Sequence, residues 1–160
     1  MKMKNREKAW CEPCDKDVHY YLEELQVTAT IDGVTFTYPY LQAHCKHCGH
    51  VISPYSIGEI NDIALYDGYK KHVGLLTSEE IIAIRKKMGL TQEGLAKLMG
   101  CGQKTITRYE NGRIQDRAFD NFIRCLDELY DLKFMSKKEQ SKNHHKSIFD
   151  KLKTPTVSQN

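Results

Sequence analysis

The sequence lacks long hydrophobic runs and has little excess of either charge. No apolar stretch approaches the ~20 residues that a helix needs to cross a bilayer, so we expect no membrane contact. The residues before Trp10 include several lysines but no apolar segment typical of a secretion signal, so we expect a cytoplasmic protein. The net charge is only +3 and 40% of the residues are hydrophobic, a balance that excludes wholesale disorder.

The charges are distributed unevenly along the chain. Residues 1–70 have an acidic excess, residues 77–131 are balanced, and the basic excess lies after Leu132. Because a patterned cluster rather than composition indicates nucleic-acid binding, the net charge does not establish it. We expect the lysine-rich tail, residues 135–160, to be flexible.

Four of the six cysteines form two closely spaced pairs, Cys11-x-x-Cys14 and Cys45-x-x-Cys48. Each such turn can direct two thiolates at one ion, and two turns complete a tetrahedron around Zn²⁺. Gly49 follows the second pair, where a positive φ lets backbone amides face sulfur. Four protein ligands leave no open position, so the sequence predicts one structural zinc ion.

The same cysteines allow three alternatives to this zinc site. Two disulfides fit a reducing compartment poorly. A thioredoxin-like redox pair would need a βαβ unit, which the spacer between the pairs does not resemble. An imidazole could replace one thiolate, and three histidines are close enough in sequence to do so: His44, His47 and His50. Cys101 and Cys125 have no partner at ligand spacing and are interpreted as ordinary small residues.

The spacer between the cysteine pairs predicts a β-hairpin. β-branched and aromatic residues alternate with threonine on both sides of Asp32-Gly33, which is a strong hairpin signal. We expect antiparallel strands over Val18–Ile31 and Val34–Ala43. Their far ends would bring the cysteine pairs together, and zinc should supply folding energy to so small a sheet.

The periodicity becomes helical after Tyr55. Gly58 and Gly68 interrupt the pattern, so we expect an irregular helix within a connector, residues 56–76. Thr77 and Glu80 then form a capping box, which predicts the start of a helix.

Two short helices separated by Gly100-Cys101-Gly102 predict a helix-turn-helix. Thr91 caps the first, and Gln103 begins the second, which ends at Asn111-Gly112. Arginine, glutamine and lysine on the outer face of the second helix suit base reading in the major groove. The candidate DNA contacts are Gln92, Gln103, Lys104, Thr107, Arg108, Asn111 and Arg113.

The pattern as a whole predicts an α+β protein of two small domains. A zinc-stapled antiparallel hairpin module occupies residues 8–55, and an all-α helix-turn-helix bundle occupies residues 77–134. The last helix, Arg117 to about Phe134, has an apolar stripe long enough to serve a two-fold dimer as well as a core.

This combination resembles the MqsA family of antitoxins, in which a YgiT-type zinc finger precedes an XRE/Cro-type DNA-binding domain. The resemblance rests on the two cysteine pairs and on "IRKKMGLTQEGLAKLMGCGQKTITRYENG", residues 84–112. It implies a homodimer that binds a palindromic operator, and a zinc domain that neutralises a protein toxin. Arg108 matches the base-reading arginine of the family, whereas Lys104 stands where better-known members have asparagine, so the operator should differ.

Two other classes of function compete with this one. A stand-alone zinc-stabilised repressor, responsive to metal or oxidation or to neither, is the alternative to an antitoxin that represses its own operon. An enzyme is not expected, because the sequence has no Ser/His/Asp arrangement, no glycine-rich phosphate loop and no open metal position.

Overall fold

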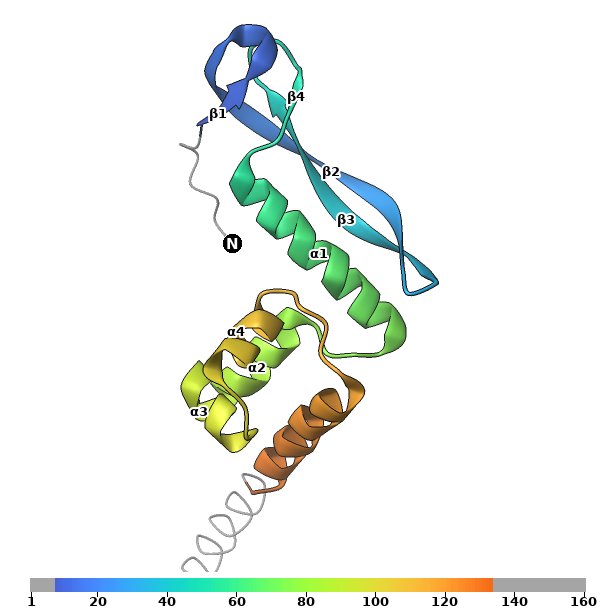
Figure 1. Ribbon diagram of the computed structural model, residues 1–160, viewed down its shortest axis with the longest axis vertical. Coiled ribbons are helices and arrows are strands. Elements are labelled where there is room, and N and C mark those ends of the chain that lie inside the picture. Colours follow the sequence, from blue (N-terminus) through green and yellow to red (C-terminus); the bar gives the residue numbers. More distant parts are fainter. Residues whose placement is uncertain (1–7, 134–160) are drawn as a thin grey trace, which may run out of the picture. The chain divides into compact units, whose positions relative to one another are not determined.

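A computed structural model describes residues 8–133 of the chain (Figure 1). The chain divides after Asp120 into two compact units. The first unit begins with a four-stranded antiparallel sheet of order β1-β2-β3-β4. Its strands are β1 (Lys8–Cys11), β2 (Lys16–Ile31), β3 (Val34–Cys45) and β4 (Val51–Ile52), with the 3-10 helix η1 (Glu12–Cys14) between the first two.

Helices make up the remainder of the described chain. They are α1 (Tyr55–Val73), α2 (Ser78–Lys87), α3 (Gln92–Leu98), α4 (Gln103–Glu110) and a last helix over residues 117–133. These elements confirm the predicted α+β class, a sheet followed by a helical region. None of the helices within residues 8–133 has the length and apolar composition to cross a membrane. The tail expected over residues 135–160 lies outside the described residues.

The predicted hairpin is present as β2 and β3, which pair from Tyr20 opposite Cys45 to Ile31 opposite Val34. Asp32 and Gly33 have φ values of 49° and 77°, the pair of positive angles that a type I′ turn requires. The turn places the two cysteine-bearing regions at the opposite end of the hairpin. Local sequence therefore sets the register that brings the cysteine pairs together.

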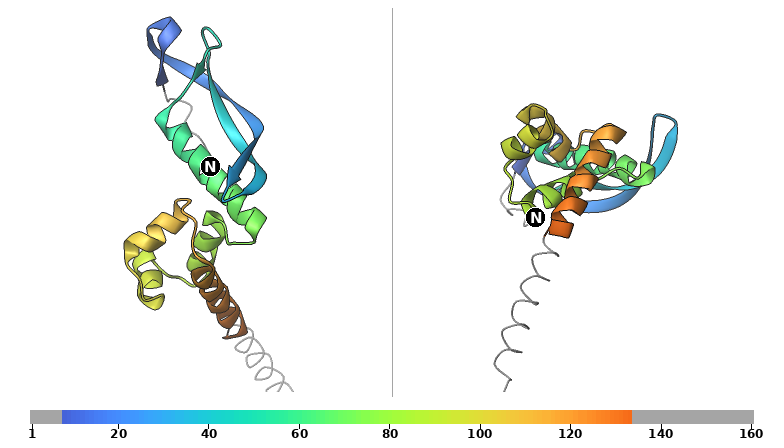
Figure 2. Two further views of the ribbon diagram at one scale, coloured as in Figure 1. Left: turned by 45° about the vertical axis from the view of Figure 1, so that its right-hand side comes forward. Right: turned by 90° about the horizontal axis from the view of Figure 1, so that it is seen from below.

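The prediction of an irregular helix in the connector is wrong, because α1 is one continuous helix that lies along the hairpin (Figures 1 and 2). A Cβ at Gly68 would lie 2.8 Å from Cβ of Tyr38 and 3.0 Å from the ring of Phe36. Gly68 is thus the point where the helix backbone meets β3 closely, and packing rather than helix breaking explains this glycine. Tyr69, the next residue, contacts the Phe36 ring edge-on at 6.0 Å between centroids.

The predicted helix caps are confirmed. The Thr77 side chain accepts a hydrogen bond from the Glu80 amide, and the Glu80 carboxylate accepts one from the Thr77 amide at 2.7 Å. The Thr91 side chain caps α3 through the Gly94 amide. The apolar residues that hold α2, α3 and α4 together are almost fully buried: Ile81, Leu95, Ala96 and Ile106.

A buried lysine ties α1 to the helix-turn-helix. The fully buried ammonium of Lys70 donates to Asp67 at 2.9 Å and to the Ser78 hydroxyl at 3.1 Å. Ser78 in turn donates from its backbone amide and its hydroxyl to Asp67. Burial lowers the pKa of Lys70, although Asp67 opposes the shift. The ion pair compensates a charge that would otherwise be costly to bury.

Candidate functional site

The four paired cysteines converge at the end of the sheet opposite the hairpin turn. Cys11 ends β1, Cys14 ends η1, Cys45 ends β3, and Cys48 lies in the following turn. Their Sγ atoms all lie within 4.8 Å of one another. The Cys11–Cys48 and Cys14–Cys45 distances are 3.5 and 3.9 Å. A tetrahedron with Zn–S bonds of ~2.3 Å has edges of about 3.8 Å, so the site has the right size for a metal ion.

The turn after Cys45 directs backbone amides at its sulfur. The amides of His47 and Cys48 lie 3.3 and 3.5 Å from Cys45 Sγ. Gly49 closes the turn with φ of 73° and donates to the Cys45 carbonyl, as its position predicts. Burial alone would raise the pKa of Cys45, but these amide hydrogen bonds, together with those from the Cys48 and Cys11 thiols, outweigh it and lower the value to about 6. The turn therefore favours the thiolate, the form that binds metal.

Burial and the crowding of thiols have the opposite effect on the first cysteine pair. The hydrogen bond with Cys48, followed by burial, raises the pKa of Cys14 to about 12. Burial likewise raises the pKa of Cys11. Since neighbouring thiolates repel one another, a divalent cation at the centre is what would keep all four ionised together.

No histidine joins the cluster of ligand atoms among the described residues. The ring of His44 stacks on Tyr21 with centroids 5.1 Å apart, and its Nε2 lies 3.1 Å from the Glu23 carboxylate. His44 therefore belongs to the β2–β3 face beside the cluster. The geometry favours four thiolates over a mixed ligand set.

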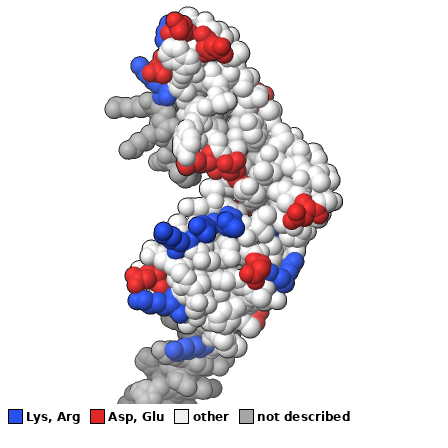
Figure 3. Space-filling view, in the orientation of Figure 1, with Lys and Arg blue, Asp and Glu red and all other residues white. Residues whose placement is uncertain are grey.

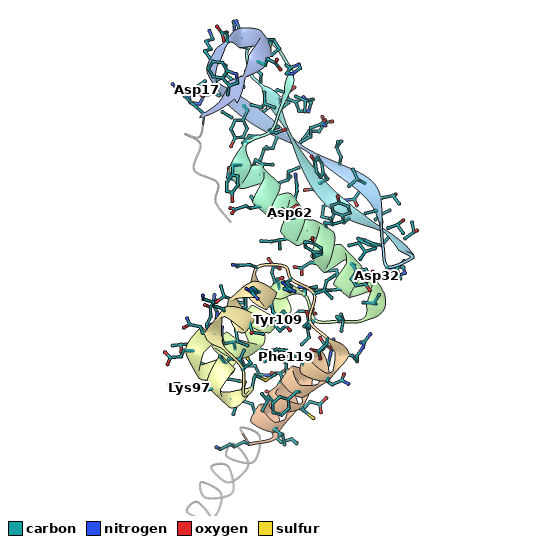
Figure 4. All side chains as sticks on the ribbon, viewed as in Figure 1. Asp17, Asp32, Asp62, Lys97, Tyr109 and Phe119 are labelled. Carbon is teal, nitrogen blue, oxygen red and sulfur yellow. The ribbon has the colours of Figure 1, made fainter. Side chains whose placement is uncertain are left out.

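The second candidate site is the outer face of α4. Most of the predicted DNA contacts are exposed there or just after the helix: Gln103, Lys104, Arg108, Asn111 and Arg113. Figure 3 shows lysine and arginine side chains gathered over α4. The opposite face is anchored by the buried Ile106 and by Tyr109, whose ring meets Phe119 edge-on at 4.8 Å (Figure 4). The helix is thus held by one face and presents basic and amide groups on the other.

The remaining two predicted contacts, Gln92 and Thr107, are joined to each other. The Thr107 hydroxyl donates to the Gln92 side-chain carbonyl at 3.0 Å. The Gln92 amide donates to the carboxylate of Glu110 at 2.9 Å, and Arg85 donates to the same oxygen at 2.9 Å. This series of hydrogen bonds runs from the buried Arg85–Glu110 ion pair to Gln92 and Thr107, at the edge of the candidate DNA-binding face.

Sequence reasoning missed the role of Glu110. Burial alone would raise its pKa, but hydrogen bonds from Arg85 and then Gln92 outweigh this and hold the pKa below 4.5. Arg85, for its part, has a raised pKa because of its hydrogen bonds to Glu110. One signal in the sequence could have indicated this role. Glu110 lies with Ile106 and Tyr109 on the inward side of an amphipathic helix, where a buried charge needs a partner.

Comparison with models of known protein families agrees with this architecture. A search of the curated proteins found no match. The model of a protein family described as the antitoxin component of a bacterial toxin-antitoxin system, MqsA, matches residues 10–133. The match includes both cysteine pairs and the whole helix-turn-helix. The chain therefore belongs to the MqsA family of antitoxins.

Proposed function

We propose that this antitoxin neutralises a protein toxin through its N-terminal module and represses its own operon through the helix-turn-helix. The observation that carries the proposal is the presence, in one chain of the MqsA antitoxin family, of a four-thiolate cluster and an exposed basic face on α4. A stand-alone repressor would have no cognate toxin, so co-expression with the adjacent gene distinguishes the two functions.

We infer that the metal is zinc and that its role is structural. Four thiolates at tetrahedral spacing are the donor set of structural zinc sites, and they leave no position for a water nucleophile. The sheet end has only a few buried apolar side chains, among them Val18, Ala43 and Ile52. Because so small a core contributes little, zinc would hold β1 and η1 against the end of β3. Free thiols of this kind suit the reducing cytoplasm.

The proposed DNA contacts divide into two groups by their surroundings. Lys104 and Arg108 are exposed on α4 and can reach base edges or phosphates. Gln92 and Thr107 are held by the chain of hydrogen bonds to Glu110, so they would meet DNA with their geometry already set. This arrangement supports sequence reading by α4 with support from the start of α3.

An exposed apolar stripe on the helix over residues 117–133 supports a homodimer. Phe122, Leu129 and Leu132 are 45, 61 and 64% exposed. Their spacing of seven and three residues places them on one side of a helix. A second copy that covers the stripe by a two-fold axis would present two α4 helices to a palindromic operator.

The deciding experiment is growth of cells that express the open reading frame adjacent to this gene, alone and together with this chain. Arrest that co-expression relieves is the expected result. The same purified chain should bind its own promoter fragment as a dimer in a gel-shift assay. Promoter binding without any arrest to relieve would leave the stand-alone repressor as the function.

A further inference from the structure

One aromatic side chain in the N-terminal module is almost entirely exposed to solvent. Tyr55, the first residue of α1, is 83% exposed, whereas Ile57 two residues later is 3% exposed and anchors the helix. Trp10 on β1 is 57% exposed and Val51 on β4 is 46% exposed. Large side chains left in water across three elements are typical of an interface, where tyrosine and tryptophan contribute most binding energy.

Tyr55 lies between two hollows of the surface. One, of 260 Å³, is lined by apolar side chains of β3, β4 and α1 that include Leu41, Val51 and Ile57. The other, of 580 Å³, is lined by Trp10 and Tyr20. Tyr55 itself lines both hollows. A partner could therefore insert a side chain on either side of this ring.

The edge of β3 beside the first hollow is closed to strand addition. Asn61, a buried residue of α1, accepts from the Leu41 amide at 2.8 Å and donates to the Leu41 carbonyl at 2.9 Å. A side chain thus occupies the backbone groups that an added strand would need. Binding at this position must use side chains placed in the hollows.

The charge around the hollows indicates which side chains of a partner would fit them. Glu59 and Asp62 line the first hollow, and no lysine or arginine among residues 8–133 does. The second hollow has Asp17 beside Lys8. Figure 3 shows acidic side chains over α1, and Figure 4 shows where Asp17 and Asp62 lie. A partner segment with an apolar anchor and neighbouring lysines or arginines complements this surface.

We propose that this region, here called the Tyr55 surface (Trp10, Val51, Tyr55, Glu59 and Asp62), is where the toxin binds, through a basic segment with an apolar anchor. The inference rests on the proposed antitoxin function and names the surface that performs it. Tyr55 is the central anchor, and the two acidic residues orient the basic segment of the toxin. The cysteine cluster does not touch the toxin in this arrangement but holds Trp10 in place through its neighbour Cys11.

The test is calorimetric titration of the full zinc-loaded chain with the purified product of the adjacent toxin gene. Tyr55→Ala should weaken binding about 30-fold, which corresponds to the ~2 kcal/mol of an interface hot spot. Tyr66→Ala is the matched control, because Tyr66 is a 39% exposed tyrosine on the same helix outside both hollows. Unchanged zinc content and promoter binding would show that each variant is folded.

A second pair of variants tests the charge argument. Glu59→Lys and Glu24→Lys change the net charge equally, but only Glu59 lines a hollow, whereas Glu24 is exposed on β2. Glu59→Lys should weaken toxin binding about tenfold at low salt and reduce its salt dependence, and Glu24→Lys should do neither.

The outcomes separate this inference from the proposed function. If the unaltered chain does not bind the toxin, the antitoxin function itself fails. If it binds and Tyr55→Ala binds equally well, the function stands and the Tyr55 surface is wrong. A Tyr55→Ala variant that changes from dimer to monomer in sedimentation, with toxin affinity intact, would assign the surface to a second copy of the chain and overturn the proposal.

Discussion

Replacing Glu110 by alanine should destabilise the helix-turn-helix much more than removing an exposed carboxylate. The Glu110 side chain is 3% exposed and accepts hydrogen bonds from Arg85 and Gln92. Its removal leaves the guanidinium of Arg85, 13% exposed, without its ionic partner. A buried charge that loses its partner must be accommodated in the folded state, and this is costly.

The size of the effect follows from the groups left behind. Breaking a buried ion pair from one side typically costs about 3–5 kcal/mol. Arg85 retains a hydrogen bond to the Leu90 carbonyl at 3.0 Å, which favours the lower end of that range. Gln92 also loses an acceptor, a change of about 1 kcal/mol. We expect a loss of about 3–4 kcal/mol in the free energy of unfolding.

Native-state hydrogen exchange of the α3 and α4 amides measures this stability separately from that of the zinc module. Glu93→Ala is the control, because Glu93 pairs with Lys97 four residues later and both side chains are largely exposed, at 61 and 77%. That pair should contribute about 0.3–0.5 kcal/mol. Equal losses for the two variants would refute the argument from burial.

The same carboxylate predicts a specific loss of stability in acid. Because the pKa of Glu110 in the folded chain lies below its ordinary value of 4.5, its ionised form stabilises the fold. That stabilisation is fully present above about pH 4.5 and is lost as the pH falls through the lower, folded-state value. Glu110→Gln should remove this component, so the stability difference between the two proteins should shrink as the pH falls. A difference that stays constant with pH would contradict it.

Three further predictions concern the metal, the DNA and the packing of α1. Cys45→Ser should collapse the dispersion of the hairpin amides in NMR spectra while promoter binding persists. Cys101→Ser, outside the cluster, should leave both the dispersion and promoter binding intact. Hairpin amides that stay dispersed and protected from exchange without metal would contradict the role of zinc. Arg108→Ala should weaken promoter binding by about 1–3 kcal/mol in gel shifts and relax preference at one base pair, whereas unchanged affinity would rule out α4 as the reading helix. Gly68→Ala should lower stability by about 1–3 kcal/mol in thermal unfolding, because its Cβ would meet β3 at 2.8 Å. Gly58→Ala, on the same helix with open space around it, should be neutral or stabilising, and equal effects of the two would contradict the packing argument.

The features that the sequence predicted correctly have local causes. The Cys-x-x-Cys spacing, the Asp32-Gly33 turn and the capping residues Thr77 and Thr91 each act within a few residues of themselves. A two-residue turn fixes strand register, and register fixes which ends meet, so the convergence of the cysteine pairs followed from local chemistry. The family resemblance rested on the same short patterns.

Tertiary structure decided the features that depend on distant neighbours. By local propensity Gly68 is a helix breaker, but β3 packs against it so closely that a side chain would not fit. Glu110 needed Arg85, twenty-five residues earlier in the chain, and Asn61 needed Leu41 on a strand edge. Whether a side chain such as Tyr55 is buried or exposed depends on the surface that other elements leave uncovered. Local propensity and spacing carry no information about such long-range pairings, because their free energy arises only when folding excludes water from both partners.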